Sequence, residues 1–304
     1  MLPYHQTMTF MKMISLTKLK GTNMWEFLEP TLGSGVPPKR NIIVSRMLMD
    51  RNLLLFVLDM VKEAVASRTA YRTMYGFYMT ALLEAIETQG LSENLLRDLW
   101  PYIISGLSSS DENYQTSTIM ILSTACWKAA VAHPLIKGAI DSMIAHTTPH
   151  LHSNAIRALV MIVQNTVASS ASSSSSSSSA PSASSSASNA TFSIVSGLIS
   201  EDTISVLASW NDTPQILSGF VKQQQYDASV LLSFLLKKLG QDLSKDASRA
   251  AFLVKLFNTL EVPDLVSDLT VTLLTTYSNT AAPIAGQNAA SASSAASSKK
   301  ANKK

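Results

Sequence analysis

The residue types best suited to metal chemistry in this chain are three histidines that lie close together, His146, His150 and His152. The first two have the i, i+4 spacing that brings two imidazole rings onto one face of a helix, as in some zinc sites. Pro149 lies between them, however, and should break the helix. No carboxylate or thiol completes a ligand set. We therefore interpret the cluster as a polar loop between helices and predict no metal site.

The single cysteine, Cys126, is the other side chain that could react. One thiol cannot form an intrachain disulfide, which favours a reducing compartment. Its neighbours include Ile121, Leu122 and Trp127, and no base is evident near it in the sequence. We predict a buried structural thiol rather than a nucleophile.

Signals for catalysis or for nucleotide binding are weak. Asp50, Arg51, Asp59 and Glu63 could suggest acid–base chemistry, but on an amphipathic helix such residues usually form the solvated face. The segment 33–35 (Gly-Ser-Gly) resembles part of a phosphate loop, yet no Lys-Ser/Thr follows it and two prolines do. The chain has no dinucleotide fingerprint, P-loop, zincin motif or paired cysteines. We predict that it is not an enzyme and has no cofactor and no small-molecule substrate.

Composition supports a helical protein with a sizeable core. The chain has 304 residues, 46% of them hydrophobic, and a formal net charge of +3. No apolar run reaches the roughly 18 residues that a membrane span needs, and no secretory signal is evident, so we predict no membrane association. Lys12, Lys18 and Lys20 precede the first acidic residue, Glu26. Mitochondrial transit peptides share that bias, but they are normally rich in Arg and Ser.

Helical periodicity dominates the chain, and several residues mark helix ends. Apolar residues recur at helical spacing from Asn52 onward, and a second helix is predicted over 69–89 with Gly90 at its C-terminal cap. Ser92 and Asp111 should cap the next two helices. Pro101 should kink or divide the helix that contains it.

These helices are short, as are their connections, and weak sequence echoes recur at shifts of about 33 to 40 residues. Each helical pair has an apolar face that only a neighbouring pair can cover. The predicted fold is therefore an all-α solenoid of HEAT-like helical hairpins. The predicted domains are a HEAT-like region at 1–168, a disordered Ser/Ala-rich linker at 169–191, a helical region at 192–280 and a disordered tail at 281–304.

The tail ends in four lysines, Lys299, Lys300, Lys303 and Lys304. Such a group can contact phosphates or assist nuclear import, although solubility alone explains it adequately. The overall charge balance does not by itself indicate binding to nucleic acid.

The most specific pattern lies at the start of the chain. It comprises the segment 2–7 (Leu-Pro-Tyr-His-Gln-Thr), a following aromatic, a Trp-Glu-Phe-Leu box at 25–28 and a Ser-Gly-Val-Pro loop at 34–37. Thr7 can cap a helix that Pro3 introduces, and Phe10 can pack on Trp25. The motif residues, which we interpret as structural or partner-facing, are Leu2, Pro3, Tyr4, His5, Thr7, Phe10, Trp25, Phe27, Leu28, Gly35 and Pro37.

This order of motifs resembles the N-terminal homology region of the HEAT-repeat U3 snoRNP-associated proteins of the small-subunit processome. Gln6 stands where that family usually has an acidic residue. The resemblance covers about residues 1–165 and is firmest over 1–60. Because family members are much longer, it predicts that this chain is a fragment of a longer protein.

The resemblance implies a nucleolar scaffold that acts in U3-guided processing of pre-rRNA for the small subunit and couples it to RNA polymerase I transcription. Its expected partners are other processome proteins, with U3 snoRNP and pre-rRNA contacted directly or indirectly. Two other hypotheses remain open: a generic α-solenoid adaptor unrelated to ribosomes, and an enzyme with a non-local site, for which no activating pair of residues is visible.

Overall fold

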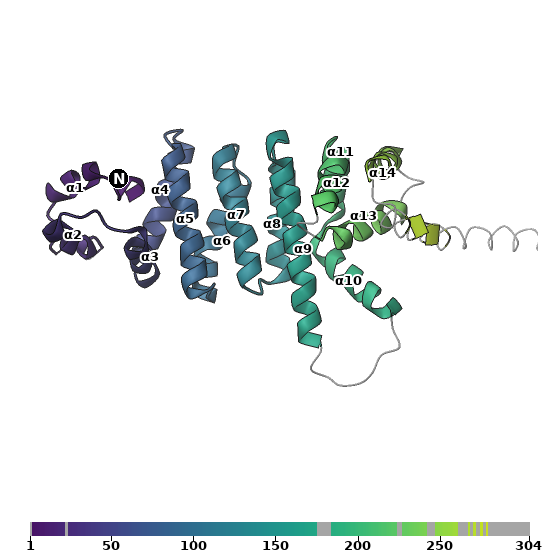
Figure 1. The fold of residues 1–304 in the computed structure, drawn as a ribbon, viewed down its shortest axis with the longest axis horizontal. Helices are drawn as coiled ribbons and strands as arrows, with labels where there is room; N and C mark the ends of the chain where they lie inside the picture. The colour runs from purple at the N-terminus through teal and green to yellow at the C-terminus, as the bar shows by residue number, and fades with distance from the viewer. Residues whose placement is uncertain are drawn as a thin grey trace, which may run out of the picture. The chain divides into compact units, whose positions relative to one another are not determined.

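A computed structural model describes residues 2–21, 24–174, 184–223, 227–241 and 247–260, together with a few isolated positions between 267 and 278. The chain divides into two compact units. Unit 1 comprises Met1–Ser182 and Gly197–Thr203, and unit 2 comprises Ala183–Ser196 and Ile204–Lys304. All regular elements in the described residues are helices (Figure 1), which confirms the predicted all-α class.

Unit 1 is built from two layers of helices. Consecutive members of the first layer lie side by side, as do those of the second, and helices adjacent in sequence pair across the layers. The first layer contains α3 (Arg40–Met49), α5 (Arg72–Gln89), α7 (Glu112–Lys128) and α9 (His152–Ser174). The second layer contains α4 (Arg51–Ala66), α6 (Glu93–Leu107) and α8 (His133–His146). This stacking of hairpins confirms the predicted solenoid.

Local sequence determines where these helices begin and end. Asp50 accepts a hydrogen bond from the Asn52 amide (3.0 Å) at the start of α4. The predicted N-caps Ser92 and Asp111 are confirmed, because each accepts a bond from the amide three residues later, at 3.3 Å and 2.9 Å. Gly90 ends α5 with a φ of 72° and a ψ of 179°, an extended conformation of positive φ that is essentially restricted to glycine.

The helix that contains Pro101 is not divided, so that part of the prediction is wrong. Helix α6 runs unbroken from Glu93 to Leu107. Proline removes one backbone donor, which leaves the carbonyl of Arg97 without its helical partner. Both residues are exposed, so water can satisfy that carbonyl, while packing against α4, α7 and α8 holds the two halves of the helix together.

The helices next to the predicted Ser/Ala-rich linker extend into it from both sides. Helix α9 continues to Ser174, and α10 (Ser184–Leu198) begins before the predicted end of the linker. Serine is tolerated in α9 because its hydroxyl bonds to the preceding turn: Ser170 Oγ donates to the Thr166 carbonyl at 2.8 Å. Residues 175–183 and the predicted tail lie outside the described residues, and the domain limits stay predictions.

Unit 2 contains α12 (Thr213–Gln223), α13 (Ser229–Gln241) and α14 (Ala247–Thr259), with most of α10 and of α11 (Glu201–Ser209). Helix α14 packs against both α12 and α13. Ser218 Oγ donates to the carbonyl of Thr259 at 2.7 Å, and the rings of Phe192 and Phe234 lie 5.4 Å apart. These contacts give unit 2 a core of its own.

Within the described residues, no single helix combines the length and apolar composition needed to cross a membrane. One bent pair, formed by Ala190–Leu198 and Glu201–Ser209, meets those two criteria only when its helices are taken together.

Candidate protein-interaction surface in the N-terminal motif

The first motif forms a compact turn that leads directly into a helix. Leu2–Tyr4 is one turn of 3-10 helix, and Thr7 is the N-cap of α1 (Met8–Ser15). Thr7 Oγ1 accepts from the Phe10 amide at 3.2 Å and donates to the Tyr4 carbonyl at 2.8 Å. The predicted capping role of Thr7 is confirmed, and the buried Pro3 fixes the backbone that enters the turn.

Aromatic contacts attach this turn to the helical layers. The Tyr4 ring stacks on Tyr71 with centroids 5.7 Å apart, and the His5 ring lies 5.5 Å from Phe77 of α5. These distances are typical of favourable aromatic pairs. They support a structural role for both motif residues.

His5 is buried, with only 6% of its surface exposed. Its Nδ1 donates to the Leu2 carbonyl at 2.9 Å, in the tautomer that this bond requires. Burial lowers the pKa of His5 below its ordinary 6.5; the Leu2 bond opposes the shift and the charge of Arg40 adds to it. The imidazole is therefore held neutral at the junction between the motif and α5.

We expect His5 to make folding sensitive to mild acid. Because the pKa is lower in the folded chain than in the unfolded one, the stabilisation is complete above pH 6.5 and is lost as the pH falls through the folded-state pKa. Urea midpoints measured from pH 8 to pH 5 should fall in the wild type, and His5→Asn, which retains a donor for the Leu2 carbonyl, should flatten part of that fall. His150→Asn, at an exposed histidine, is the control. Identical pH profiles for the wild type and His5→Asn would contradict the assignment.

The Trp-Glu-Phe-Leu box forms the second part of the motif. The Trp25 ring meets Phe56 of α4 edge-on, with centroids 5.3 Å apart, and lies 6.5 Å from Phe27. Leu28 is 2% exposed. Phe10 and Trp25, predicted to pack together, line the same cavity. Sequence reasoning missed Phe56, whose only signal was an aromatic residue on the polar side of an amphipathic helix.

The Ser-Gly-Val-Pro loop ends helix α2 (Glu29–Ser34). Gly35 has a φ of 66°, and its amide donates to the Thr31 carbonyl at 3.0 Å. A left-handed residue at this position is a common way to end a helix, and glycine adopts it at no steric cost. The loop, which continues through Pro37, is thus a helix terminus and not a phosphate-binding loop, as the sequence predicted.

These segments enclose an apolar cavity of about 360 Å³ at the N-terminal end of unit 1. Its walls come from the first motif, α1, the turn after α1, the Trp-Glu-Phe-Leu box and α4. The lining residues are Leu2, Phe10, Ile14, Thr17, Lys18, Leu19, Trp25, Leu28 and Phe56. The N-terminal motif therefore builds a concave, largely apolar surface, and we name it the N-terminal groove.

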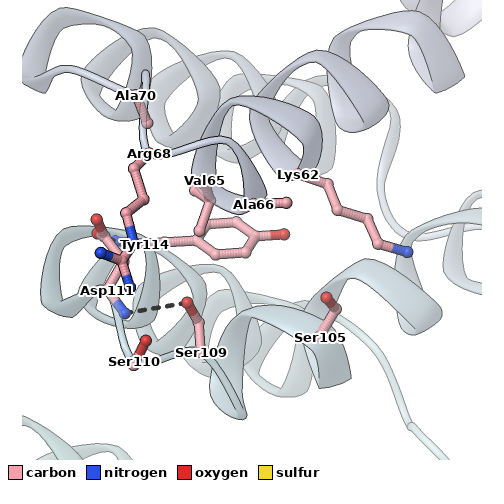
Figure 2. A pocket seen from close by; sticks show the side chains of 10 residues that line it. All are labelled: Lys62, Val65, Ala66, Arg68, Ala70, Ser105, Ser109, Ser110, Asp111 and Tyr114. Carbon is pink, nitrogen blue, oxygen red and sulfur yellow. Dashed lines mark hydrogen bonds between the residues drawn. The ribbon is translucent and has the colours of Figure 1, made fainter.

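A second, polar pocket of about 750 Å³ lies where the C-terminal ends of α4 and α6 meet the start of α7 (Figure 2). The basic side chains of Lys62 and Arg68 come from α4 and the residues after it, and serine hydroxyls come from α6 and the α6–α7 connection. Asp111 accepts from the Tyr75 hydroxyl at 2.8 Å, and its amide donates to Ser109 Oγ. None of the ten described lining residues is a histidine or a cysteine. The serine hydroxyls of the pocket therefore have no imidazole among the lining residues to act as a base.

The acidic and basic residues assigned to the solvated face of α4 are exposed or half-exposed, as predicted, and two of them, Arg51 and Asp59, also bond to α6. Arg51 Nε and Nη2 each donate to one carboxylate oxygen of Asp98 at 2.7 Å. Arg51 thereby lowers the pKa of Asp98. Tyr102 donates to Asp59 at 2.5 Å, and burial with this bond raises the pKa of Tyr102 to about 12. Asp98 and Tyr102 lie on α6, far along the chain, so the α4 sequence alone could not show that Arg51 and Asp59 bond to them.

The three histidines do not converge on a shared site. His152 is buried, whereas His146 and His150 are exposed, and the His146 ring bonds to the Ser142 carbonyl at 2.9 Å. Across the part of the chain that the structure describes, no group of three His, Cys, Asp or Glu side chains is placed to hold a metal ion.

Cys126 is buried in α7, which confirms the predicted structural thiol, and burial raises its pKa to about 12. We expect its reaction with Ellman's reagent at pH 8 to be at least about a hundredfold slower in the folded chain than in guanidinium, because the thiolate is the reactive form. Since the chain has one cysteine, the absorbance reports this site alone. Equal rates in the two conditions would contradict the assigned burial.

Comparison with known proteins finds relatives that match part of the chain. No family model matches the chain. Human HEAT repeat-containing protein 1 is 26% identical to it over an alignment of 174 residues, and the match covers 54% of this chain and 8% of the human protein. The zebrafish protein of the same name is 24% identical over 178 residues, with the same two coverages. The Drosophila melanogaster homologue is 22% identical over 167 residues, 53% of this chain and 8% of its own.

The chain thus spans about 8% of the length of these curated relatives. The shared name describes a repeat architecture, and unit 1 is a two-layer array of stacked helical hairpins of that kind. Over about half of its length, this chain is a homologue of HEAT repeat-containing protein 1.

Proposed function

We propose that this chain is a non-catalytic scaffold segment of the small-subunit processome, acting in the nucleolus in pre-rRNA processing for 18S maturation and in its coupling to RNA polymerase I transcription. Its partners are other processome proteins, with U3 snoRNP and pre-rRNA contacted directly or through them. The observation that carries the proposal is the motif order of residues 2–37, which resembles the processome family and which folds here into one groove-bearing structure.

The architecture supports a scaffold rather than an enzyme. A solenoid offers extended surfaces formed by successive repeats, and binding to such surfaces needs shape and charge rather than a reactive centre. In the polar pocket, Asp111 is held by Tyr75 and by the Tyr114 amide, and the lone thiol of Cys126 is buried. Neither arrangement supplies an activated nucleophile.

Affinity purification of the tagged chain from nuclear extract tests the proposal, with mass spectrometry of the proteins and probing for U3 and pre-rRNA. We expect processome proteins and U3 together, and a parallel RNase-treated sample separates direct protein contacts from RNA-mediated ones. Recovery of a cytosolic partner set without ribosome factors would instead establish the alternative, a generic α-solenoid adaptor, which the relatives' name fits equally well.

A further inference from the structure

Arg68 adopts a backbone conformation that arginine rarely occupies. It is the one non-glycine residue with a positive φ (56°) among the residues that the structure describes. It follows Ser67, the C-cap of α4, and the Thr69 amide closes the turn by donating to the Ala64 carbonyl at 2.8 Å. Glycine is the usual residue at this point of a helix end, because a Cβ atom makes the left-handed conformation unfavourable. An arginine at a strained position points to a use for its side chain.

The guanidinium group of Arg68 has no charged partner and faces the polar pocket. Arg68 is exposed, lines that pocket and forms no ion pair with another described residue. In Figure 2 its side chain reaches from the α4–α5 connection toward the α6–α7 connection, which carries Ser109 and Ser110. A cation at the end of α4 also gains from the helix dipole. A cation anywhere in the last turn would gain as much, so the dipole does not explain the strained position.

Ser110 is the serine of the α6–α7 connection whose hydroxyl is available. Ser108 Oγ donates to a carbonyl of α6 at 2.9 Å, and Ser109 Oγ accepts from the Asp111 amide at 3.1 Å. Ser110 is exposed, and its hydroxyl forms no hydrogen bond with another described residue. Two carboxylates, those of Asp111 and Glu112, follow it directly in the sequence. Protein kinases select substrates by charge pattern, and this pattern suits a kinase that has a basic substrate groove.

We propose that Ser110 is a phosphorylation site and that its phosphate binds Arg68. A protein kinase directed by acidic residues would transfer the γ-phosphoryl group of ATP to Ser110 Oγ. The new O–P bond forms as the bond to the β,γ-bridging oxygen breaks, ADP leaves with that electron pair, and the hydroxyl proton passes to the base of the kinase. The product carries about −1.5 to −2 charges at pH 7 and three acceptor oxygens, which suit the donor fork of an arginine.

This modification would join two neighbouring hairpins of unit 1. Arg68 belongs to the connection between α4 and α5, and Ser110 belongs to the connection between α6 and α7. The polar pocket that both residues line has a volume of about 750 Å³, which leaves room for a phosphate group. A charge-assisted bond across it would hold the two connections together and restrict the movement of one hairpin against the next.

The two carboxylates beside Ser110 are bonded elsewhere. Asp111 accepts from the Tyr75 hydroxyl at 2.8 Å and from an amide of α7 at 2.9 Å. Glu112 accepts from Thr148 at 2.9 Å, in the connection between α8 and α9. Their negative charges still repel a phosphate, so the contribution of the arginine is measured as a difference between chains that keep both carboxylates.

Phosphorylation of the purified full chain with ATP and an acid-directed serine kinase tests the site, and mass spectrometry locates the modified residue. We expect phosphate on Ser110, and a severalfold slower reaction in Glu112→Gln, which keeps an acceptor for Thr148. Ser200 is an internal control. It also precedes two acidic residues, but its hydroxyl donates to Asp141 Oδ1 at 2.7 Å, so it should react more slowly.

A free peptide of residues 104–116 shows whether the kinase recognises the sequence. The site is refuted if Ser110 stays unmodified in the folded chain, whether or not the peptide is phosphorylated. It is also refuted if another residue of the α6–α7 connection takes up the phosphate instead, or if Ser200 reacts as fast as Ser110.

Phosphorus NMR of the full chain with Ser110→phosphoserine, introduced by genetic encoding, tests the pairing. A bound cation lowers the second pKa of a phosphate because it favours the dianion. The titration midpoint should therefore lie about one pH unit higher after Arg68→Gln. Lys62→Gln, which removes a cation at the other end of the pocket in Figure 2, is the matched control and should change the midpoint little. Equal midpoint changes in the two variants, or none in either, would overturn the pairing.

Arg68→Gly in the unmodified chain separates this role from a purely structural one. Glycine adopts the left-handed conformation without strain, so the variant should unfold at a higher urea concentration than the unsubstituted chain. An arginine that serves the fold alone predicts the opposite. A lower urea midpoint in Arg68→Gly would therefore assign Arg68 to stability and overturn the inference.

Discussion

Gly106→Ala is expected to destabilise unit 1 by about 3 kcal/mol, near the upper limit for overpacking a core. A Cβ atom at Gly106 would lie 2.1 Å from Thr118 Oγ1, 2.9 Å from its Cβ and 3.0 Å from its Cγ2. Thr118 is fully buried in α7, and its hydroxyl donates to the Tyr114 carbonyl at 2.8 Å. A β-branched side chain held in this way has few rotamers to move into. Helices α6 and α7 would therefore have to separate.

Chemical denaturation followed by circular dichroism measures this loss, and Gly138→Ala is its matched control. Gly138 lies within α8, and nothing stands within 4 Å of a Cβ added there. That substitution should be neutral or stabilising by roughly 0.5–1 kcal/mol, because alanine favours a helix more than glycine does. Thr118→Ala combined with Gly106→Ala should recover part of the loss. Equal effects of the two single alanine variants would refute the close approach of α6 and α7.

Gln115→Met is expected to destabilise unit 1 by about 2 kcal/mol, because it leaves two carbonyls without a donor. Gln115 is fully buried in α7, and its Nε2 donates to the Leu107 carbonyl at 2.9 Å and to the His146 carbonyl at 3.1 Å. These are the last residues of α6 and α8, where carbonyls have no intrahelical partner. One side chain thus joins the ends of two neighbouring hairpins. The loss is reduced because Gln115 Oε1 is itself buried without a partner.

The same denaturation experiment with Gln89→Met is the control, because it makes the same change of side-chain size and polarity at an exposed position. Gln89 is the last residue of α5 and is exposed, so its substitution should change stability by less than about 0.5 kcal/mol. If Gln115→Met is as stable as Gln89→Met, the proposed junction between hairpins does not contribute to folding.

Features set by a few adjacent residues were predictable from the sequence. The caps at Thr7, Ser92 and Asp111 and the terminal Gly90 depend on local hydrogen bonds and backbone conformation, and all four are confirmed. Pro101 follows an equally local rule, but the free energy that it costs α6 is smaller than the stabilisation that α6 gains by packing against its neighbours. The solenoid itself followed from apolar faces that only stacked hairpins can cover.

Features set by contacts between distant segments were not predictable. The sequence suggests one apolar face on α7, yet α7 packs against α5, α6 and α9, and even its Ser117, Thr118 and Gln115 are buried. Polar residues give no sign of such burial in a periodicity pattern. The motif residues were identified as a set, but their partners Phe56, Tyr71 and Phe77 lie far along the chain. Of these pairs, Trp25 with Phe56 lines the N-terminal groove.

Rapid depletion of the protein in cells, followed by pulse-labelling of ribosomal RNA, tests the central claim most directly. A scaffold of the small-subunit processome should be needed for each transcript to yield 18S rRNA. We predict that newly made 18S falls relative to large-subunit rRNA while unprocessed precursor increases as a share of total transcript, and that overall labelling declines if transcription by RNA polymerase I is coupled. An unchanged ratio of 18S to large-subunit rRNA after complete depletion would contradict the proposed function.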